Sequence, residues 1–192
     1  MSVPLYVDVD TLKLALGIKT TDPTRDPLLD IALSGAARAI YRRTGKRRFD
    51  QDSTPTSKII ETRGRTVWDR HLCRHRLLLP DIATATGLLV QDEAGTTTYP
   101  VDIQYPDSPD EPITSVAMYA FPWRVKVTAT FGWPNVPDDI VQAHLLQAMR
   151  YYRRKDSPEG IAGSAEWGLV RVPRVDPDVE EMISDYCYPA VA

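Results

Sequence analysis

Residues 124–155 read RVKVTATFGWPNVPDDIVQAHLLQAMRYYRRK, and this stretch decides the class of fold. In residues 124–131 polar and apolar side chains alternate, which is typical of a strand with one solvated and one buried face. Turn residues follow in 132–137, and apolar side chains then recur at helical spacing. The helical stripe consists of Val141, Leu145, Ala148 and Tyr152. A strand that leads into a long amphipathic helix indicates an α+β protein.

Upstream of this stretch the sequence predicts a matching helix and a β-rich section. A short helix should end at Leu16, because Gly17 is suited to terminate it. Asp26 and Pro27 are a helix cap and a first-turn proline for a helix over about 27–44. Its apolar stripe, at the same spacing as the later one, is Leu29, Leu33, Ala36 and Ile40. Between the long helices, period-two patterns predict strands at 58–63, 76–80, 87–92, 97–103, 112–120 and 124–133.

The expected architecture is α+β, with two long packed helices, an inserted β-rich lobe and a C-terminal loop-strand-helix segment. Neither long helix buries its stripe alone, so the two should pack on each other. The 192 residues suit a single domain. We expect a helical start (1–55), a β-rich insertion (56–133) and a second core helix (134–155). The remainder, 156–192, should hold a loop, a strand at 169–174 and a closing helix.

Charge is strongly segregated although the net charge is only −3. Residues 31–76 hold twelve Lys or Arg against four acids, whereas residues 77–123 hold seven acids and no Lys or Arg. Blocks of this size would let the acidic face of one copy meet the basic face of the next. The alternative is that the blocks interleave in space into a mixed, solvated surface.

Chemistry-bearing residues give no catalytic pattern. His71, Cys73 and His75 of HLCRH would share one face on a strand and so raise the question of zinc. A fourth ligand is missing and Arg70, Arg74 and Arg76 surround them, so a loop or strand end with incidental polar residues is the favoured interpretation. His144 lies beside the apolar stripe of the second helix and is expected to be a hydrogen-bonded helix histidine. We expect neither an enzyme, nor a metal, nor a cofactor.

Two groups of basic residues mark possible contact surfaces. The cluster Arg42, Arg43, Lys46, Arg47 and Arg48 has the charge to contact phosphates, but a helix C-terminus also favours cations and no DNA-binding motif encloses it. The end of the second long helix carries a further set, Arg150, Arg153 and Arg154. We interpret this second set as candidate protein-interface residues.

The C-terminal segment supplies the other interface candidates. Trp167 lies in a loop of small residues, DSPEGIAGSAEWG (156–168), where an anchor on a partner is favoured over a cap on the protein's own core. Arg171 and Arg174 are the only basic residues of 156–192 and lie on the strand predicted at 169–174. This strand either pairs with the edge of a partner or completes the chain's own β-lobe.

Taken in order, four passages resemble the head-to-tail adaptor (head-tail connector) family of long-tailed bacteriophages, in forms from phages and prophages of actinobacteria. They are YVDVDTLKLALGI with DPLLDIALSGAARAIYRRTGKRRF, then RLLLPDIATATGLLVQDEAGTTTYPVDIQ, then VTATFGWPNVPDDIVQAHLLQAMRYYRRKDSPEG, and last IAGSAEWGLVRVPRVDPDVEEMISDY. The resemblance covers nearly the whole chain and rests on order and spacing. HLCRH (71–75) and the acidic loop 107–111 match nothing in the family.

The resemblance implies a ring subunit that binds beneath the portal protein, typically in twelve copies. Such a subunit belongs to the virion neck and is assembled in the bacterial host cytoplasm. It extends the channel for double-stranded DNA without reading its sequence, and gives a platform for the head-tail stopper or another neck protein. We expect a mainly monomeric free protein, and portal contact through 156–192.

Other functions remain open at this point. A head-tail stopper or tail terminator is the nearest alternative, and a nucleic-acid-binding protein or a small metal-dependent hydrolase are alternatives from other classes. No stretch has the roughly 18 apolar residues of a membrane span, so no membrane partner is expected.

Overall fold

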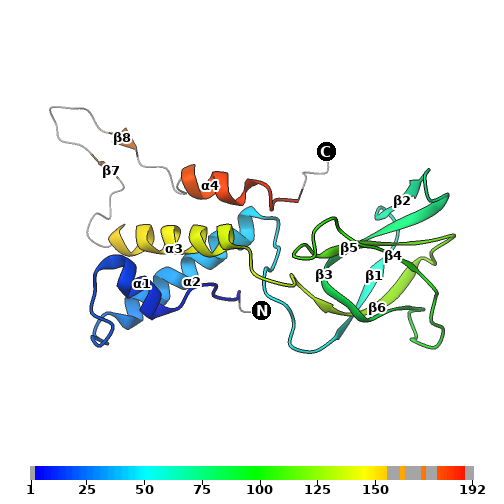
Figure 1. Cartoon of the computed structure of the whole chain (residues 1–192), viewed down its shortest axis with the longest axis horizontal. Helices are drawn as coiled ribbons and strands as arrows, with labels where there is room; N and C mark the ends of the chain where they lie inside the picture. Colours follow the sequence, from blue (N-terminus) through cyan, green and yellow to red (C-terminus); the bar gives the residue numbers. More distant parts are fainter. Residues whose placement is uncertain (1–2, 155–160, 163–169, 172–176, 189–192) are drawn as a thin grey trace. The chain divides into compact units, whose positions relative to one another are not determined.

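The computed structural model describes residues 3–154, 161–162, 170–171 and 177–188. Two compact units make up the chain: a helical unit of Met1–Arg47 with Pro137–Ala192, and a sheet unit of Arg48–Val136 (Figure 1). Helices account for 31% and strands for 28% of the structure, which confirms the expected α+β class. No helix in the described ranges is both long and apolar enough to cross a lipid bilayer.

The helical unit contains α1 (Val9–Leu16), α2 (Asp26–Arg43), α3 (Asp138–Arg153) and α4 (Pro177–Ser184). Asp8 caps α1 by accepting a hydrogen bond from the Thr11 backbone N–H at 2.7 Å. Gly17 ends the helix in the left-handed conformation, with φ of 70°. α2 begins and ends within one residue of the predicted 27–44, because its first-turn proline and terminal charges are local signals. The prediction of Asp26 as its cap was wrong, since Asp26 is the first helical residue and the N-cap is Arg25, without a side-chain hydrogen bond. α3 begins four residues after the start and ends two residues before the end of the predicted 134–155.

One apolar core joins α1, α2 and α3, and α3 contacts each of the other three helices (Figure 1). The buried members are Val7, Leu12, Leu29, Ala32, Leu33, Ala36, Ala148 and Tyr152. Gly35 of α2 allows close approach of α3, since a Cβ there would lie 3.3 Å from the Tyr151 ring. Of the stripe residues, Leu33 is fully buried whereas Leu145 is half-buried.

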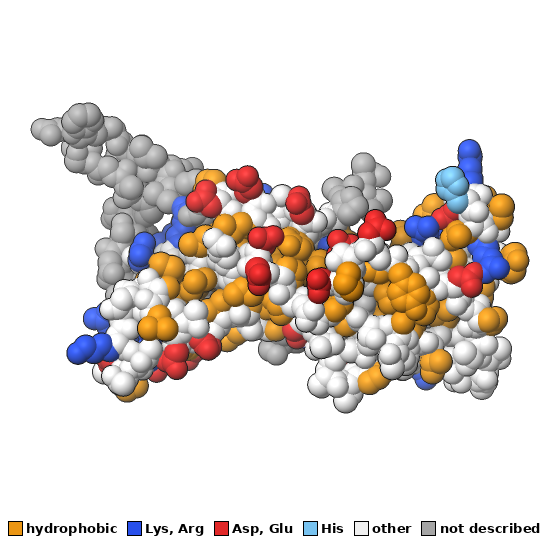
Figure 2. All heavy atoms as spheres, in the orientation of Figure 1, with side chains coloured by type: hydrophobic (Ala, Val, Ile, Leu, Met, Phe, Trp, Pro, Cys, Tyr) orange, Lys and Arg blue, Asp and Glu red, His pale blue; other side chains and the backbone are white. Residues whose placement is uncertain are grey.

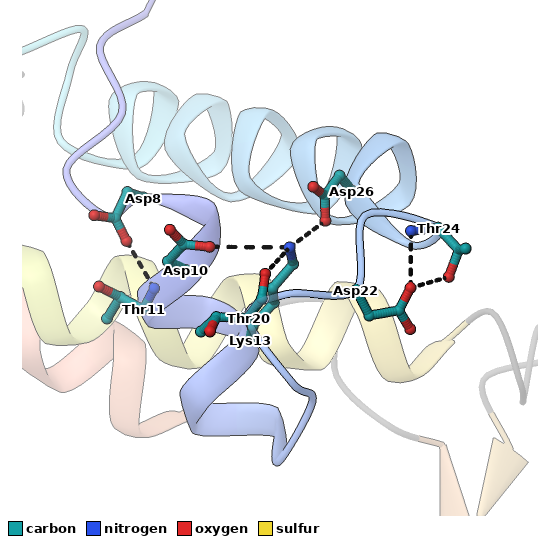
Figure 3. A network of polar contacts seen from close by, with 8 residues as sticks. All are labelled: Asp8, Asp10, Thr11, Lys13, Thr20, Asp22, Thr24 and Asp26. Atoms are coloured by element: carbon teal, nitrogen blue, oxygen red, sulfur yellow. Dashed lines mark hydrogen bonds and ion pairs between the residues drawn. The ribbon is translucent and has the colours of Figure 1, made fainter.

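A buried lysine ties the turn after α1 to the start of α2 (Figure 3). The Lys13 ammonium lies 2.6 Å from the Asp26 carboxylate and donates to the Thr20 carbonyl at 3.1 Å. Asp22 organises the same turn by accepting from the backbone N–H and the hydroxyl of Thr24. The lysine is 2% exposed, so these oxygens replace the water that its charge would otherwise require.

The sheet unit holds one six-stranded antiparallel sheet. Its strands are β1 (Thr56–Glu61), β2 (Thr66–Asp69), β3 (Arg74–Gln91), β4 (Asp102–Gln104), β5 (Ile113–Met118) and β6 (Arg124–Phe131). The order is β1-β6-β3-β5-β4, with β2 paired to β3, so β1 and β4 are the two ends of this path. The core of the unit consists of Ile60, Leu77, Leu79, Ile82, Val90, Ile113, Val116, Val125, Val127, Ala129 and Phe131.

The strand predictions were wrong in the middle of the sheet. The segments 76–80 and 87–92 are the two halves of the single strand β3, which changes register between Leu78 and Ile82 and again before Leu89. These irregularities bend β3, so its first half pairs with β2 and β5 and its second half with β6. The expected strand 97–103 shortens to β4, and β2 was not predicted.

The entry and exit chains of the sheet unit contact each other. The Asp52 N–H donates to the Phe131 carbonyl at 2.8 Å, and the Gly132 N–H donates to the Asp81 carbonyl at 2.8 Å. Trp133 packs against Phe49, with ring centroids 5.3 Å apart, and donates to the buried Asp81 carboxylate at 3.1 Å. Backbone and side-chain bonds together therefore close this end of the unit.

Of the strand predicted at 169–174, the structure describes Val170 and Arg171, and both lie in a strand; the other residues of this range lie outside the described ones. β8 (Val170–Arg171) pairs antiparallel with β7 (Ile161–Ala162), so the two form a separate two-stranded sheet and β8 adds nothing to the six-stranded one. The closing helix is α4, and its Val179 and Ile183 are buried.

Candidate functional site

His144 is a structural histidine, as the sequence predicts. It is fully buried on α3; its Nε2 lies 3.0 Å from the Leu33 carbonyl, and its Nδ1 accepts from the Tyr6 N–H at 3.3 Å. These partners require a neutral ring with the proton on Nε2. Burial lowers the pKa of His144 below its ordinary value of 6.5, although the bond to Leu33 opposes this shift.

Acid is therefore expected to destabilise the helical unit through His144. Because the pKa is lower in the folded than in the unfolded protein, the stabilisation is complete above about pH 6.5 and is lost as the pH falls below it. Urea unfolding at pH 7.5 and pH 5 measures this loss. His144→Gln, which does not titrate, should show a smaller difference between the two pH values, and His71→Gln at an exposed position should behave as wild type. An equal difference in wild type and His144→Gln would contradict the assignment.

The structure does not align the HLCRH residues on one face of a strand. His71 and Cys73 lie in the exposed turn between β2 and β3, and only His75 lies on a strand, with its ring edge-on to Trp68 at 4.9 Å. Asp69 holds the turn by accepting from the N–H groups of His71 and Leu72 at 2.9 and 3.1 Å. The strand geometry that would align all three residues is thus absent. Within the described part of the chain no three His, Cys, Asp or Glu residues are grouped to hold a metal ion.

Three residues of the basic cluster at the end of α2, Arg43, Arg47 and Arg48, contact other residues of the same chain. The Arg43 guanidinium lies 2.8 Å from the Glu180 carboxylate of α4. Arg47 donates to the Tyr186 carbonyl at 3.0 Å and stacks over the Tyr188 ring at 4.6 Å. In the sheet unit, Arg48 pairs with Asp50 and Asp52 at 2.7 and 3.0 Å. These contacts lower the charge available for phosphates, and those of Arg43 and Arg47 hold residues 180–188 against the end of α2.

Tyr186 adds another such contact. Its hydroxyl donates to the Asp139 carboxylate in the first turn of α3 at 3.1 Å. Burial, together with this hydrogen bond, raises the pKa of Tyr186 to about 12. The segment from α4 to Tyr188 is therefore part of the packed helical unit.

The interface candidates at the end of α3 are brought together. Arg150 and Arg153 lie in its last turn and Arg154 is its C-cap residue, so the negative end of the helix dipole favours all three. Arg153 is exposed, and the other two are half-buried. Of the C-terminal candidates, only the backbone of Arg171 in β8 is described; Trp167, Arg174 and the Arg171 side chain lie outside the described residues.

Sequence reasoning missed a set of exposed aromatic side chains on the sheet unit. Trp123 is 57% exposed with Arg63 over its ring at 5.6 Å, and Arg74 lies over the exposed Tyr119 at 4.6 Å while also pairing with Asp102. Figure 2 shows apolar side chains at the surface of this unit, with basic side chains near its β2 end. Exposed aromatic and arginine side chains are the types that dominate protein interfaces. The sequence feature that could have identified these exposed aromatic residues is their position at 119–124, beside turns.

No protein-family model matches the chain, and no curated protein gives a significant match to it. Among solved structures, the chain is similar to one in a structure described as "Neck of empty GTA particle computed with C6 symmetry". The TM-score is 0.58 at 21% sequence identity, over 100% of this chain and 95% of that chain. At this identity the likeness is one of fold, and it extends over both units.

Proposed function

We propose that this protein is a structural subunit of the neck of a phage-like particle. The observation that carries the proposal is the likeness to a chain of a GTA neck over the full length of this chain. The four sequence passages that resemble head-to-tail adaptors support the same class of function independently. Exposed aromatic and arginine side chains on the sheet unit supply surface for protein contacts.

Within the neck, the proposed role is that of the head-to-tail adaptor. Copies form a ring, expected to be a dodecamer, beneath the portal protein, extend the DNA channel and present a platform to the next neck protein and the tail. The role is geometric, so the proposal includes no catalytic step, no cofactor and no metal. Chelator treatment should accordingly leave the protein folded. A stopper or tail terminator is the alternative within the same neck.

The test is the order of binding among purified neck components. Native mass spectrometry of the chain mixed with the portal protein of its own particle should show a portal ring carrying many copies of this chain. A stopper would bind only after an adaptor is present, and a tail terminator would bind the tail tube without the portal. Strong, salt-dependent binding of the free chain to DNA, without portal binding, would instead favour a nucleic-acid-binding protein.

The portal contact is proposed to involve residues 156–192. Removal of the whole segment is a poor test, because α4 buries Val179 and Ile183 and contacts α3. Trp167→Ala and Arg171→Glu/Arg174→Glu change the candidate residues and leave α4 in place. We expect these variants to unfold as wild type does and to bind the portal more weakly. If portal binding were unchanged, the contact would lie elsewhere on the chain, and Arg150, Arg153 and Arg154 would be the next candidates.

A further inference from the structure

The two ends of the sheet are flanked by opposite charge, basic beside β1 and acidic after β4. Beside β1 lies a groove of about 300 Å³ lined by Lys58, Ile59, Ile60, Glu61, Arg63, Arg65 and Pro80. The lining thus holds three basic side chains and one acidic one. Beyond β4 lies the exposed loop 105–111, with Asp107, Asp110 and Glu111. The two edges are therefore complementary in charge.

The backbone of β1 is open on the side away from β6. In the described part of the chain its residues pair with β6 alone, from Thr56 opposite Ala129 to Glu61 opposite Arg124. Among the described residues, no hydrogen bond from another segment reaches the outer N–H and C=O groups of residues 57–60. β4 likewise pairs only with β5. Unpaired strand edges are templates for a strand of another chain.

We infer that β1 of one copy docks beside β4 and the acidic loop 105–111 of the next copy. Charge complementarity supports this pairing. Each edge also carries one exposed large apolar side chain, Ile59 at 59% exposure on β1 and Tyr105 at 68% just after β4. The inference rests on the proposed function in one respect, because it describes how ring subunits contact each other.

The topology also fits a ring. Four successive antiparallel pairings separate β1 from β4, so the two strands run in the same direction. A neighbour related by the rotation of a ring then brings them together in parallel, as a heterologous contact. A two-fold dimer through β1 would instead place Lys58, Arg63 and Arg65 of both copies on the same edge. Repulsion among these like charges disfavours that dimer.

The docking is expected to be weak for an isolated pair, because β4 has only three residues and parallel pairing is the less stable kind. Nuclear magnetic resonance of the full chain, diluted from roughly millimolar concentration in low salt, measures such an equilibrium. Amide signals of 56–61 and of 102–111 should shift together on dilution. Added salt should weaken the association.

Charge reversal provides the decisive comparison. Arg63→Glu/Arg65→Glu and Asp107→Lys/Glu111→Lys should each weaken self-association by roughly tenfold or more. A mixture of the two variants should regain it, because each reversed edge then meets an opposite charge. The matched control, Arg38→Glu/Arg42→Glu, changes the net charge of the chain by the same amount on exposed positions of α2.

Three results would overturn the inference: no concentration dependence in wild type, a mixture no tighter than the single variants, or a control that weakens association equally. Circular dichroism verifies that each variant is folded. The proposed function is judged separately by portal binding. Binding to the portal with no coupling between β1 and β4 removes this inference and leaves the neck assignment in place.

Discussion

Gly132→Ala is expected to lower the free energy of unfolding of the sheet unit by more than about 4 kcal/mol. A Cβ at this position would lie 2.8 Å from both the Asp50 carbonyl carbon and the Gln51 Cα, and closer still to the Asp50 oxygen. These atoms belong to backbone, which does not rotate away as a side-chain tip does. The φ of +117° adds strain for any residue with a Cβ. Urea unfolding followed by tryptophan fluorescence measures the loss.

Gly64→Ala is the matched control for this substitution. Gly64 also has a positive φ, of +76°, but a Cβ there would meet nothing within 4 Å. It should therefore cost only the strain of the left-handed conformation, about 1–2 kcal/mol. Similar losses for the two variants would show that the backbone at 50–51 moves aside easily, contrary to the closure described for this end of the unit.

Leu33→Ala should lower the free energy of unfolding of the helical unit by about 2–5 kcal/mol. Leu33 is 0% exposed in the core that joins α1, α2 and α3, and its backbone carbonyl is the partner of His144. Truncation leaves a cavity where helix packing is tight, so the surroundings collapse only in part. Chemical denaturation monitored by far-ultraviolet circular dichroism gives the value.

Ile31→Ala, two residues away on the same helix, serves as the reference. Ile31 is 69% exposed, so its truncation should change stability by no more than about 0.5 kcal/mol. Leu145→Ala on α3 should fall between the two, since Leu145 is half-buried. If Leu33→Ala lowered the free energy of unfolding no more than Ile31→Ala, the assignment of Leu33 to the core would be wrong.

The helices were predictable from sequence because their signals are local. Asp8, Gly17 and the first-turn Pro27 act within one turn, and the apolar stripes repeat over about three turns. The middle of the sheet was not predictable in the same way. β2 has no buried side chain and thus no alternation, and the bulges of β3 break one strand into two apparent ones. Bulges depend on neighbouring strands that the local pattern does not contain.

The charge blocks illustrate a similar limit for the candidate site. Part of the charge does interleave, as in Arg74 with Asp102 and Arg124 with Glu93. Another part lies at the ends of the sheet, beside β1 and beyond β4. The order of the strands in the sheet decides which charges pair with each other and which lie at the ends of the sheet. That order follows from pairing between segments far apart in the sequence. Likewise, the sequence around Arg43 and Arg47 does not predict their partners in 180–188, which lie more than 130 residues away.

The closure of the sheet unit at residues 49–52 and 131–133 makes that unit separable. Since the chain enters and leaves at neighbouring points, joined by Asp52 to Phe131 and by Phe49 to Trp133, the fragment Arg48–Val136 carries its own termini side by side. We expect such a module to tolerate excision, circular permutation or exchange for another module. One unit can then change in sequence or be replaced while the other is retained.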